Sequence, residues 1–217
     1  MGKLEENKKR KKQLLLDSSF DLFMKKGWLE TTISDIVKQA NVAKGTFYLY
    51  YKDKYDIRNN LISYKANQLL LNAHEDLIKN HSEITDLKDQ IVHIMKYIVL
   101  SLRDNHSLLK FIAKNLSWGV FKSALNTVSE DSDGLNFWDL FWKMIPEQSI
   151  SENEAEIMIF QIIELIGSTA YNVILFDEPV TLDEYMPYLE RSVRLIMDSY
   201  IKDLDYTPVN STPVFLD

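Results

Sequence analysis

The stretch from Thr31 to Tyr55 constrains the fold more than any other part of the chain, because it holds two short helical patterns separated by a tight polar turn. Thr32 and Asp35 have the spacing of a capping box at the start of the first helix. The apolar face of that helix is formed by residues at helical spacing, namely Ile33, Ile36, Val37 and Ala40. Asn41 follows in the turn and tolerates left-handed backbone geometry. This layout predicts a helix-turn-helix, whose second helix lies in the major groove of DNA.

The second helix is expected to begin near Lys44 and to turn Phe47 and Tyr51 inward, because these two residues lie four apart. A helix this short cannot bury four neighbouring aromatic residues, so Tyr48 and Tyr50 are expected on its outer face. Gly45 weakens a helix by about 1 kcal/mol relative to alanine. Its expected benefit is a close approach of the backbone to a phosphate.

Lys54 is the remaining unusual residue of this region, since it follows the expected helix cap Asp53 and opposes the helix dipole. A phosphate opposite its ammonium would explain that position. The predicted DNA-binding residues are Thr32, Ser34, Lys44, Gly45, Thr46, Tyr48, Tyr50 and Lys54. The alternatives stay open: both lysines can be ordinary solvated side chains, and Thr46 can contact a base, a phosphate or only solvent.

The pattern T-T-I-x-D-I-V-x-x-A-x-V-x-K-G-T-F-Y-x-Y-Y-x-x-K, from Thr31 to Lys54, resembles the signature of the TetR family of repressors. Residues 15–28 look like the first helix of that family. Two departures are visible: Ala43 stands where the family often has a capping serine, and Ser18 and Ser19 replace small apolar residues. The resemblance implies a three-helix DNA-binding domain, followed by a helical domain that binds a small effector and dimerises through its last two helices.

The charge distribution agrees with DNA binding at the N-terminal end only. The chain carries a net charge of −7, yet residues 1–65 hold 14 Lys and Arg against 8 Asp and Glu, a net +6, and the remainder is at −13. The basic part includes residues 8–12, Lys-Lys-Arg-Lys-Lys, which predict either salt-dependent phosphate contacts or a solubilising tail. The acidic remainder should be repelled by the duplex.

The rest of the chain shows helical periodicity and no convincing strand alternation, so the predicted class is all-α. We expect a helix-turn-helix DNA-binding domain over residues 1–55, an effector-binding and dimerisation domain over 56–205 and an irregular tail over 206–217. Capping boxes are expected at Ser151 and Thr181. A helix break is expected near Gly119, and Pro187 should kink the last helix or mark its start.

The last two predicted helices are too apolar to be covered on one side only, which predicts a homodimer interface. The alternative is a purely intramolecular core. The apolar stretch 157–176 is interrupted by four polar residues and is not expected to span a membrane. With no cysteine in the chain, no disulfide is possible, and a cytoplasmic location is expected.

An effector pocket is predicted where the chain is dense in aromatic residues, with a polar stripe along one helix. Its candidate lining is Tyr97, Phe111, Asn115, Trp118, Phe121, Trp138, Phe141, Trp142, Gln161, Glu164, Ser168 and Asn172. The alternative is an aromatic core, with the polar stripe facing solvent or the dimer axis. The expected effector is small and largely apolar or aromatic.

An enzyme is not expected, because the sequence has no phosphate-binding glycine loop and no nucleophile elbow. The four histidines lack the HExxH spacing, so neither a metal site nor a cofactor is expected. The sequence therefore predicts a repressor that binds a palindromic operator as a homodimer and is released by the effector. The alternatives are an activator, or an accessory or architectural DNA-binding protein whose second domain binds a protein partner.

Overall fold

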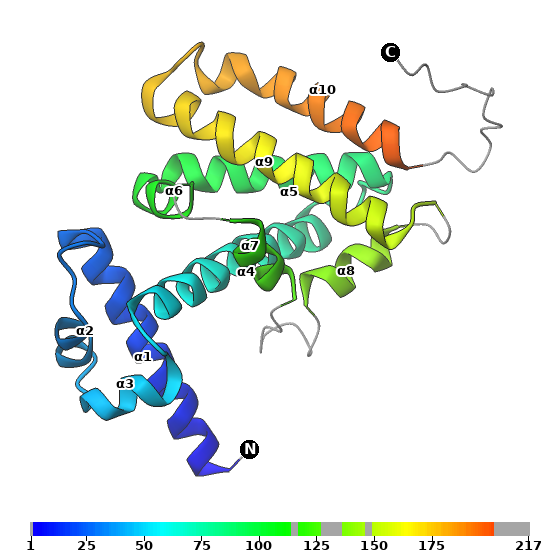
Figure 1. The fold of residues 1–217 in the computed structure, drawn as a ribbon. Helices are drawn as coiled ribbons and strands as arrows, with labels where there is room; N and C mark the ends of the chain where they lie inside the picture. Colours follow the sequence, from blue (N-terminus) through cyan, green and yellow to red (C-terminus); the bar gives the residue numbers. More distant parts are fainter. Residues whose placement is uncertain (1, 114–116, 127–135, 146–148, 202–217) are drawn as a thin grey trace, which may run out of the picture. The chain divides into compact units, whose positions relative to one another are not determined.

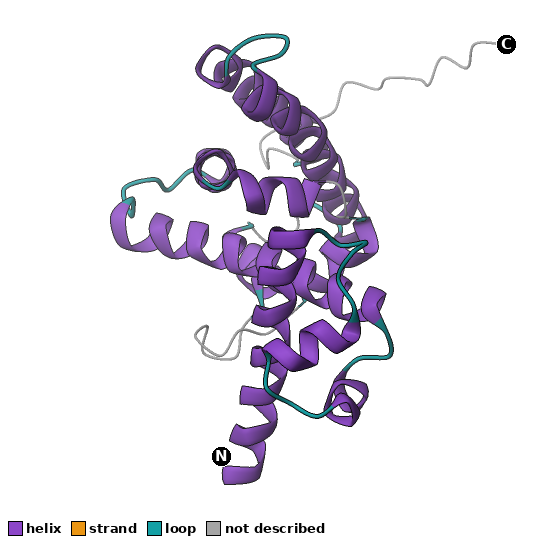
Figure 2. Ribbon diagram, turned by 90° about the vertical axis from the view of Figure 1, so that its left-hand side faces the viewer, coloured by secondary structure: helices purple, strands orange, loops and turns teal. Residues whose placement is uncertain are grey.

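A computed structural model describes residues 2–113, 117–126, 136–145 and 149–201, and in these ranges every regular element is an α-helix (Figure 1, Figure 2). The all-α prediction is therefore confirmed. The helices, in chain order, are α1 (Lys3–Lys26), α2 (Ile33–Gln39), α3 (Lys44–Tyr50), α4 (Lys54–Asn80), α5 (Leu87–Asp104), α6 (His106–Ala113), α7 (Trp118–Leu125), α8 (Phe137–Met144), α9 (Glu152–Phe176) and α10 (Leu182–Tyr200).

The chain forms two compact units. Unit 1 comprises residues 1–84 and 93–140, and unit 2 comprises residues 85–92 and 141–217. In unit 1, α1 packs on α2 and α4, α2 packs on α3, and α4 packs on α6 and α7. In unit 2, α9 packs along α10. The predicted domain boundary after residue 55 falls inside α4, and the predicted tail lies outside the described residues, so that division stays a prediction.

The predicted helix caps are confirmed. Thr32, Ser151 and Thr181 each accept a hydrogen bond from the backbone N–H three residues on, and the acidic side chain at that third position accepts from the backbone of the capping residue. Such a pair satisfies two backbone donors that a helix start would otherwise leave unpaired. Local sequence therefore sets where α2, α9 and α10 begin.

The expected helix break near Gly119 is confirmed, because α6 ends at Ala113 and the extended residue Ser117 caps α7 two residues before Gly119. Of the two alternatives for Pro187, the start of the helix is excluded, because α10 begins five residues earlier at Leu182 and contains the proline. The kink stays a prediction. The capping box at Thr181 and the burial of Leu182 both favour the earlier start.

By length and composition, α9 is the one helix of the described ranges that is apolar enough to cross a membrane. One face of this helix is buried, including Met158, Ile162 and Ala170. Its other face carries exposed residues, among them Ile157 and Phe160. A core helix with a second apolar face has the same composition as a membrane span, so composition alone does not separate the two.

Candidate DNA-binding surface

The first part of the surface is the start of α2, where charge and capping act together. Asp35 Oδ2 accepts from the Thr32 backbone N–H at 2.8 Å and lies 2.6 Å from the Lys26 ammonium on α1. The Lys26 hydrogen bond, followed by those from Thr32, holds the pKa of Asp35 well below its usual range. Asn41 then reverses the chain with a φ of 51°, as predicted from its tolerance of left-handed geometry. The Lys26–Asp35 ion pair thus ties the start of α2 to α1, and Asn41 makes the turn that precedes α3.

The inner face of α3 is held by two aromatic residues. Phe47 is fully buried and Tyr51 is 2% exposed, with ring centroids 5.7 Å apart, so the predicted inward pair is confirmed. Burial raises the pKa of the Tyr51 hydroxyl, with smaller contributions from Asp56 and Tyr50. Large buried rings of this kind anchor a short helix that could not be stable alone.

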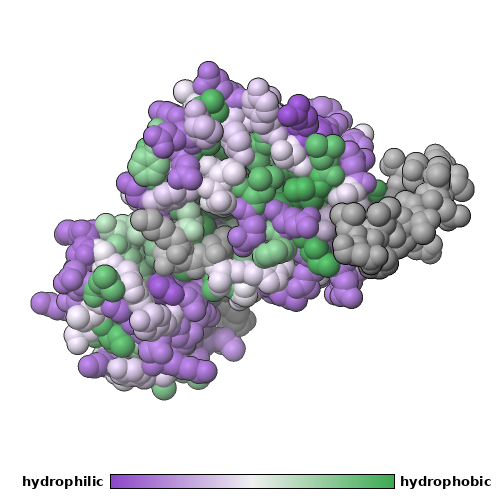
Figure 3. Space-filling view, turned by 45° about the horizontal axis from the view of Figure 1, so that its top comes forward, coloured by the Kyte–Doolittle hydropathy of each residue, from purple (hydrophilic) through white to green (hydrophobic). Residues whose placement is uncertain are grey.

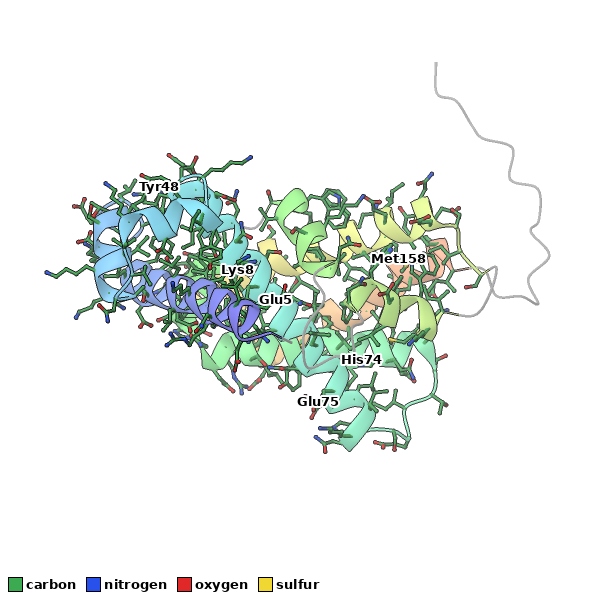
Figure 4. All side chains as sticks on the ribbon, turned by 90° about the horizontal axis from the view of Figure 1, so that it is seen from below. Glu5, Lys8, Tyr48, His74, Glu75 and Met158 are labelled. Carbon is green, nitrogen blue, oxygen red and sulfur yellow. The ribbon has the colours of Figure 1, made fainter. Side chains whose placement is uncertain are left out.

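The outer face of α3 is formed by Lys44, Gly45, Tyr48 and Leu49, all exposed. Tyr48 is 53% exposed, and Figure 4 shows it at the outer edge of its helix. Leu49 is 80% exposed and was not among the predicted contacts. Helical geometry could have found it, because at 3.6 residues per turn Leu49 lies about 200° around the helix from Phe47. An exposed leucine here suits an apolar contact with a thymine methyl group.

Gly45 has no intramolecular reason to be glycine. A Cβ built at this position meets no atom within 4 Å, and its φ is not positive. The helix therefore carries the conformational cost of a glycine with no packing benefit inside the chain. This observation supports, without testing, the prediction that the backbone approaches a phosphate here.

Lys54 is half-buried and its ammonium is turned toward the chain itself, which argues against the predicted phosphate contact without testing it. Its Nζ donates to the carbonyl oxygens of Trp28 at 2.9 Å, Thr31 at 3.0 Å and Leu29 at 3.3 Å. The same ammonium lies 4.4 Å from the centre of the Trp28 ring. All three N–H groups are thereby directed into the loop between α1 and α2. Lys54 ties the start of α4 to that loop.

The remaining predicted contacts are placed as follows. Ser34 and Thr32 are exposed at the start of α2, although the Thr32 hydroxyl already bonds to Asp35. Thr46 and Tyr50 are half-buried at the sides of α3. The basic residues 8–12 lie in α1 and are exposed, so that run is helical.

The predicted effector residues fall into both units. Tyr97, Phe111, Trp118, Phe121 and Trp138 belong to unit 1, whereas Phe141 and Trp142 belong to unit 2 together with the polar stripe. Asn115 lies outside the described residues. A single pocket that contains all of them therefore stays a prediction.

Two observations bear on that prediction. The polar stripe of α9, formed by Gln161, Glu164, Ser168 and Asn172, is exposed, so it holds no buried polar group that requires a ligand as partner. Phe111 on α6 is buried, with its ring 5.7 Å from that of Phe20 and 6.1 Å from that of Phe23, both on α1. Phe111 therefore joins α6 directly to the helix on which α2 packs.

Known proteins share both this sequence pattern and this fold. Residues 15–61 match the model of bacterial regulatory proteins of the tetR family. The fatty acid metabolism regulator protein of Bacillus subtilis is 29% identical over 103 residues, which are 48% of this chain and 51% of that protein. The biofilm operon negative regulator IcaR of Staphylococcus epidermidis is 26% identical over 87 residues, 40% of this chain and 45% of its own. The chain thus spans about half the length of these two relatives.

Solved structures extend the likeness of fold to most of the chain. A TetR transcriptional regulator from Rhodococcus sp. RHA1 has a TM-score of 0.63 at 12% identity, and covers 88% of this chain and 97% of its own. Thermus thermophilus FadR, solved in complex with lauroyl-CoA, has a TM-score of 0.52 at 17% identity and covers 92% and 100%. At these identities the likeness shows the fold.

Proposed function

We propose that the chain, whose residues 15–61 match the model of bacterial regulatory proteins of the tetR family, is a transcriptional regulator of that family that binds a palindromic DNA operator as a homodimer. The observation that carries the proposal is the division of α3 into two faces. Phe47 and Tyr51 hold the helix from within, while Lys44, Tyr48 and Leu49 project outward. A helix so anchored presents its outer side chains to base edges in a major groove.

The charge of residues 1–65 supports the same role. The exposed basic run of α1 and Lys44 belong to the part of the chain with net charge +6, which favours the phosphate backbone. In this proposal Lys44, the Gly45 backbone and the α1 lysines contact phosphates and set the orientation, whereas Tyr48 and Leu49 contact bases. Phosphate contacts position the protein, and base contacts give specificity.

Dimerisation through α9 and α10 is the second part of the proposal. The exposed large apolar residues of these helices are Ile157, Phe160, Phe176, Tyr188 and Leu195. Figure 3 shows apolar surface interrupting a largely polar exterior. Gly167 and Ser168, also exposed on α9, allow a second helix to approach closely. A symmetric four-helix contact with a second copy would cover this surface.

The third part is release of DNA by a small, largely apolar effector. Its support in this chain is the aromatic density of the predicted lining and the ring contact between Phe111 and α1. A ligand that shifts α6 would act on α1 through Phe111. It would lower DNA affinity to the extent that it binds the conformation that releases DNA more tightly than the conformation that binds DNA. A long-chain acyl-CoA is the first effector to test, because a relative is named a fatty acid metabolism regulator. A cytoplasmic location follows from a role on DNA.

The test begins with selection of bound duplexes from a random-sequence library, followed by fluorescence anisotropy on the enriched duplex. Tyr48→Ala and Lys44→Ala should each weaken binding at least tenfold, whereas Ile78→Ala, a change at a residue 57% exposed at the end of α4, should not. Equal DNA affinity of the wild type and the three variants would refute the placement of the surface on α3. Binding that neither acyl-CoA nor a panel of small apolar compounds relieves would favour an accessory or architectural protein over a ligand-responsive regulator.

A further inference from the structure

Three side chains of the kind that bind metal ions meet in unit 1 where α4 ends. Asp76 lies in the penultimate turn of α4, His81 caps that helix, and His93 lies on α5. Asp76 Oδ2 is 2.9 Å from His93 Nε2 and 3.9 Å from His81 Nε2, and the two imidazole centroids are 4.5 Å apart. Figure 4 labels Glu75, the residue before Asp76, on this part of α4.

Neighbouring groups orient these three side chains. The Asn80 side-chain amide donates to Asp76 Oδ1 at 2.8 Å, which leaves Oδ2 directed at the two histidines. Glu83 Oε1 lies 3.4 Å from His81 Nδ1, behind the ring, so the opposite nitrogen Nε2 is turned toward Asp76. A carboxylate behind a histidine is the usual arrangement that fixes the tautomer of a metal-binding imidazole.

The geometry fits a tetrahedral ion. Zinc binds imidazole nitrogen and carboxylate oxygen at about 2.0–2.2 Å, so two of its ligand atoms lie about 3.3 Å apart. The two distances from Asp76 Oδ2 bracket that value, and all three ligand atoms lie within 4.8 Å of one another. All three residues are half-buried, which leaves room for water as a fourth ligand.

The ligand types select among ions. Two nitrogens and one oxygen suit zinc and related transition metals, whereas magnesium and calcium prefer oxygen ligands throughout. The position at the C-terminal end of α4 also favours a cation, because the helix dipole is negative there. The alternative is a simple ion pair between His93 and Asp76. Such a pair would not require His81, which Glu83 orients from behind, to face Asp76 Oδ2 as well.

We propose that Asp76, His81 and His93 bind one zinc ion, or a similar divalent transition metal, which joins the end of α4 to α5. The site departs from the expectation of no metal because its ligands come from two elements and not from one helix with HExxH spacing. It is independent of the DNA-binding proposal, since none of its residues belongs to α1, α2 or α3. A bound ion would raise the free energy of unfolding. Once the free ion concentration exceeds the dissociation constant, this increase grows with the logarithm of that concentration.

The test uses the full chain without a polyhistidine tag, freed of metal by chelation, and titrated with Zn²⁺ in competition with a chromogenic chelator. One equivalent per chain should bind. His81→Gln and His93→Gln should each weaken binding about a hundredfold or more, and Glu83→Gln about tenfold to a hundredfold. His106→Gln is the matched control, because His106 is an exposed histidine on α6 of the same unit.

Circular dichroism of each variant checks that the helices are intact, and His81→Gln is the variant least able to disturb packing because its side chain is 42% exposed. Replacement of Zn²⁺ by Co²⁺ should give the visible absorption of tetrahedral coordination in the wild type, in His106→Gln and, at higher Co²⁺ concentration, in Glu83→Gln, but not in His81→Gln or His93→Gln. No zinc binding at micromolar concentration would overturn the proposal. Binding that survives equally in His81→Gln and His93→Gln would overturn it too.

Discussion

The hydrogen bonds of Lys54 within unit 1 give a sharp prediction, because the lysine at position 44 is instead proposed to contact DNA. Lys54→Met removes an ammonium that donates to three carbonyl oxygens and lies over the Trp28 ring, while methionine keeps most of the aliphatic stem. Lys44→Met removes an exposed ammonium on the outer face of α3. The two variants lose the same charge.

The expected cost of Lys54→Met follows from the contacts. The two shorter hydrogen bonds contribute about 0.5–1.5 kcal/mol each. The contact with the Trp28 ring adds about 0.5–1 kcal/mol. Holding the Lys54 side chain in place costs conformational entropy, and relief from that cost in the variant offsets part of the lost stabilisation. A net loss of about 2 kcal/mol lowers the melting temperature of a chain of this size by about 4–8 °C.

The assay pairs thermal melting by circular dichroism with DNA anisotropy at several salt concentrations, well below the melting temperature. Lys44→Met should melt within about 1 °C of the wild type. It should reduce the slope of log affinity against log salt by about 0.9 for each phosphate that the Lys44 ammonium neutralises in the wild type. Lys54→Met should melt lower and keep the wild-type slope. A lower melting temperature for Lys44→Met together with a reduced salt slope for Lys54→Met would refute the reasoning.

Three further outcomes follow from the described contacts. Gly45→Ala should raise the free energy of unfolding by about 0.5–1 kcal/mol, because nothing lies within 4 Å of the added Cβ, and should weaken DNA binding; unchanged DNA affinity would contradict the phosphate approach. The lowered pKa of Asp35 stabilises the fold above the unfolded pKa of about 3.9. The excess melting temperature of the wild type over Asp35→Asn should therefore be present at pH 7 and shrink from about pH 5 to pH 3, and a constant excess would contradict it. Leu195→Arg, at a residue 61% exposed on α10, should yield monomers by light scattering, whereas Leu29→Arg, at a residue 82% exposed in unit 1, should not; a dimer in both would exclude this face.

Much of the helix-turn-helix was predictable because its determinants are local. The capping pair Thr32 and Asp35, the left-handed Asn41 and the inward spacing of Phe47 and Tyr51 all act within a few residues of one another. Local signals of this kind are read directly from spacing. The outward side of α3 follows from the same spacing, including Leu49, once the inward pair is known.

The features that the sequence did not reveal depend on residues far apart in the chain. Lys54 bonds to carbonyl oxygens 23 to 26 residues away, and no local pattern indicates that reach. Asp76 and His93 are 17 residues apart and meet only because α5 passes the end of α4. For α10, the capping box and Pro187 favour different starts, and the burial of Leu182, which depends on the folded core, supports the cap.

The most direct test of the central claim is the sequence that the intact protein selects from a random duplex library. Two outward faces of α3, related by a dimer axis, predict an inverted repeat whose half-sites are spaced by about one helical turn or a multiple of it. Loss of enrichment in Tyr48→Ala, with the protein still folded and dimeric, would support the account. Selection of a single unrepeated site, or the same repeat after Tyr48→Ala and Lys44→Ala are combined, would contradict it.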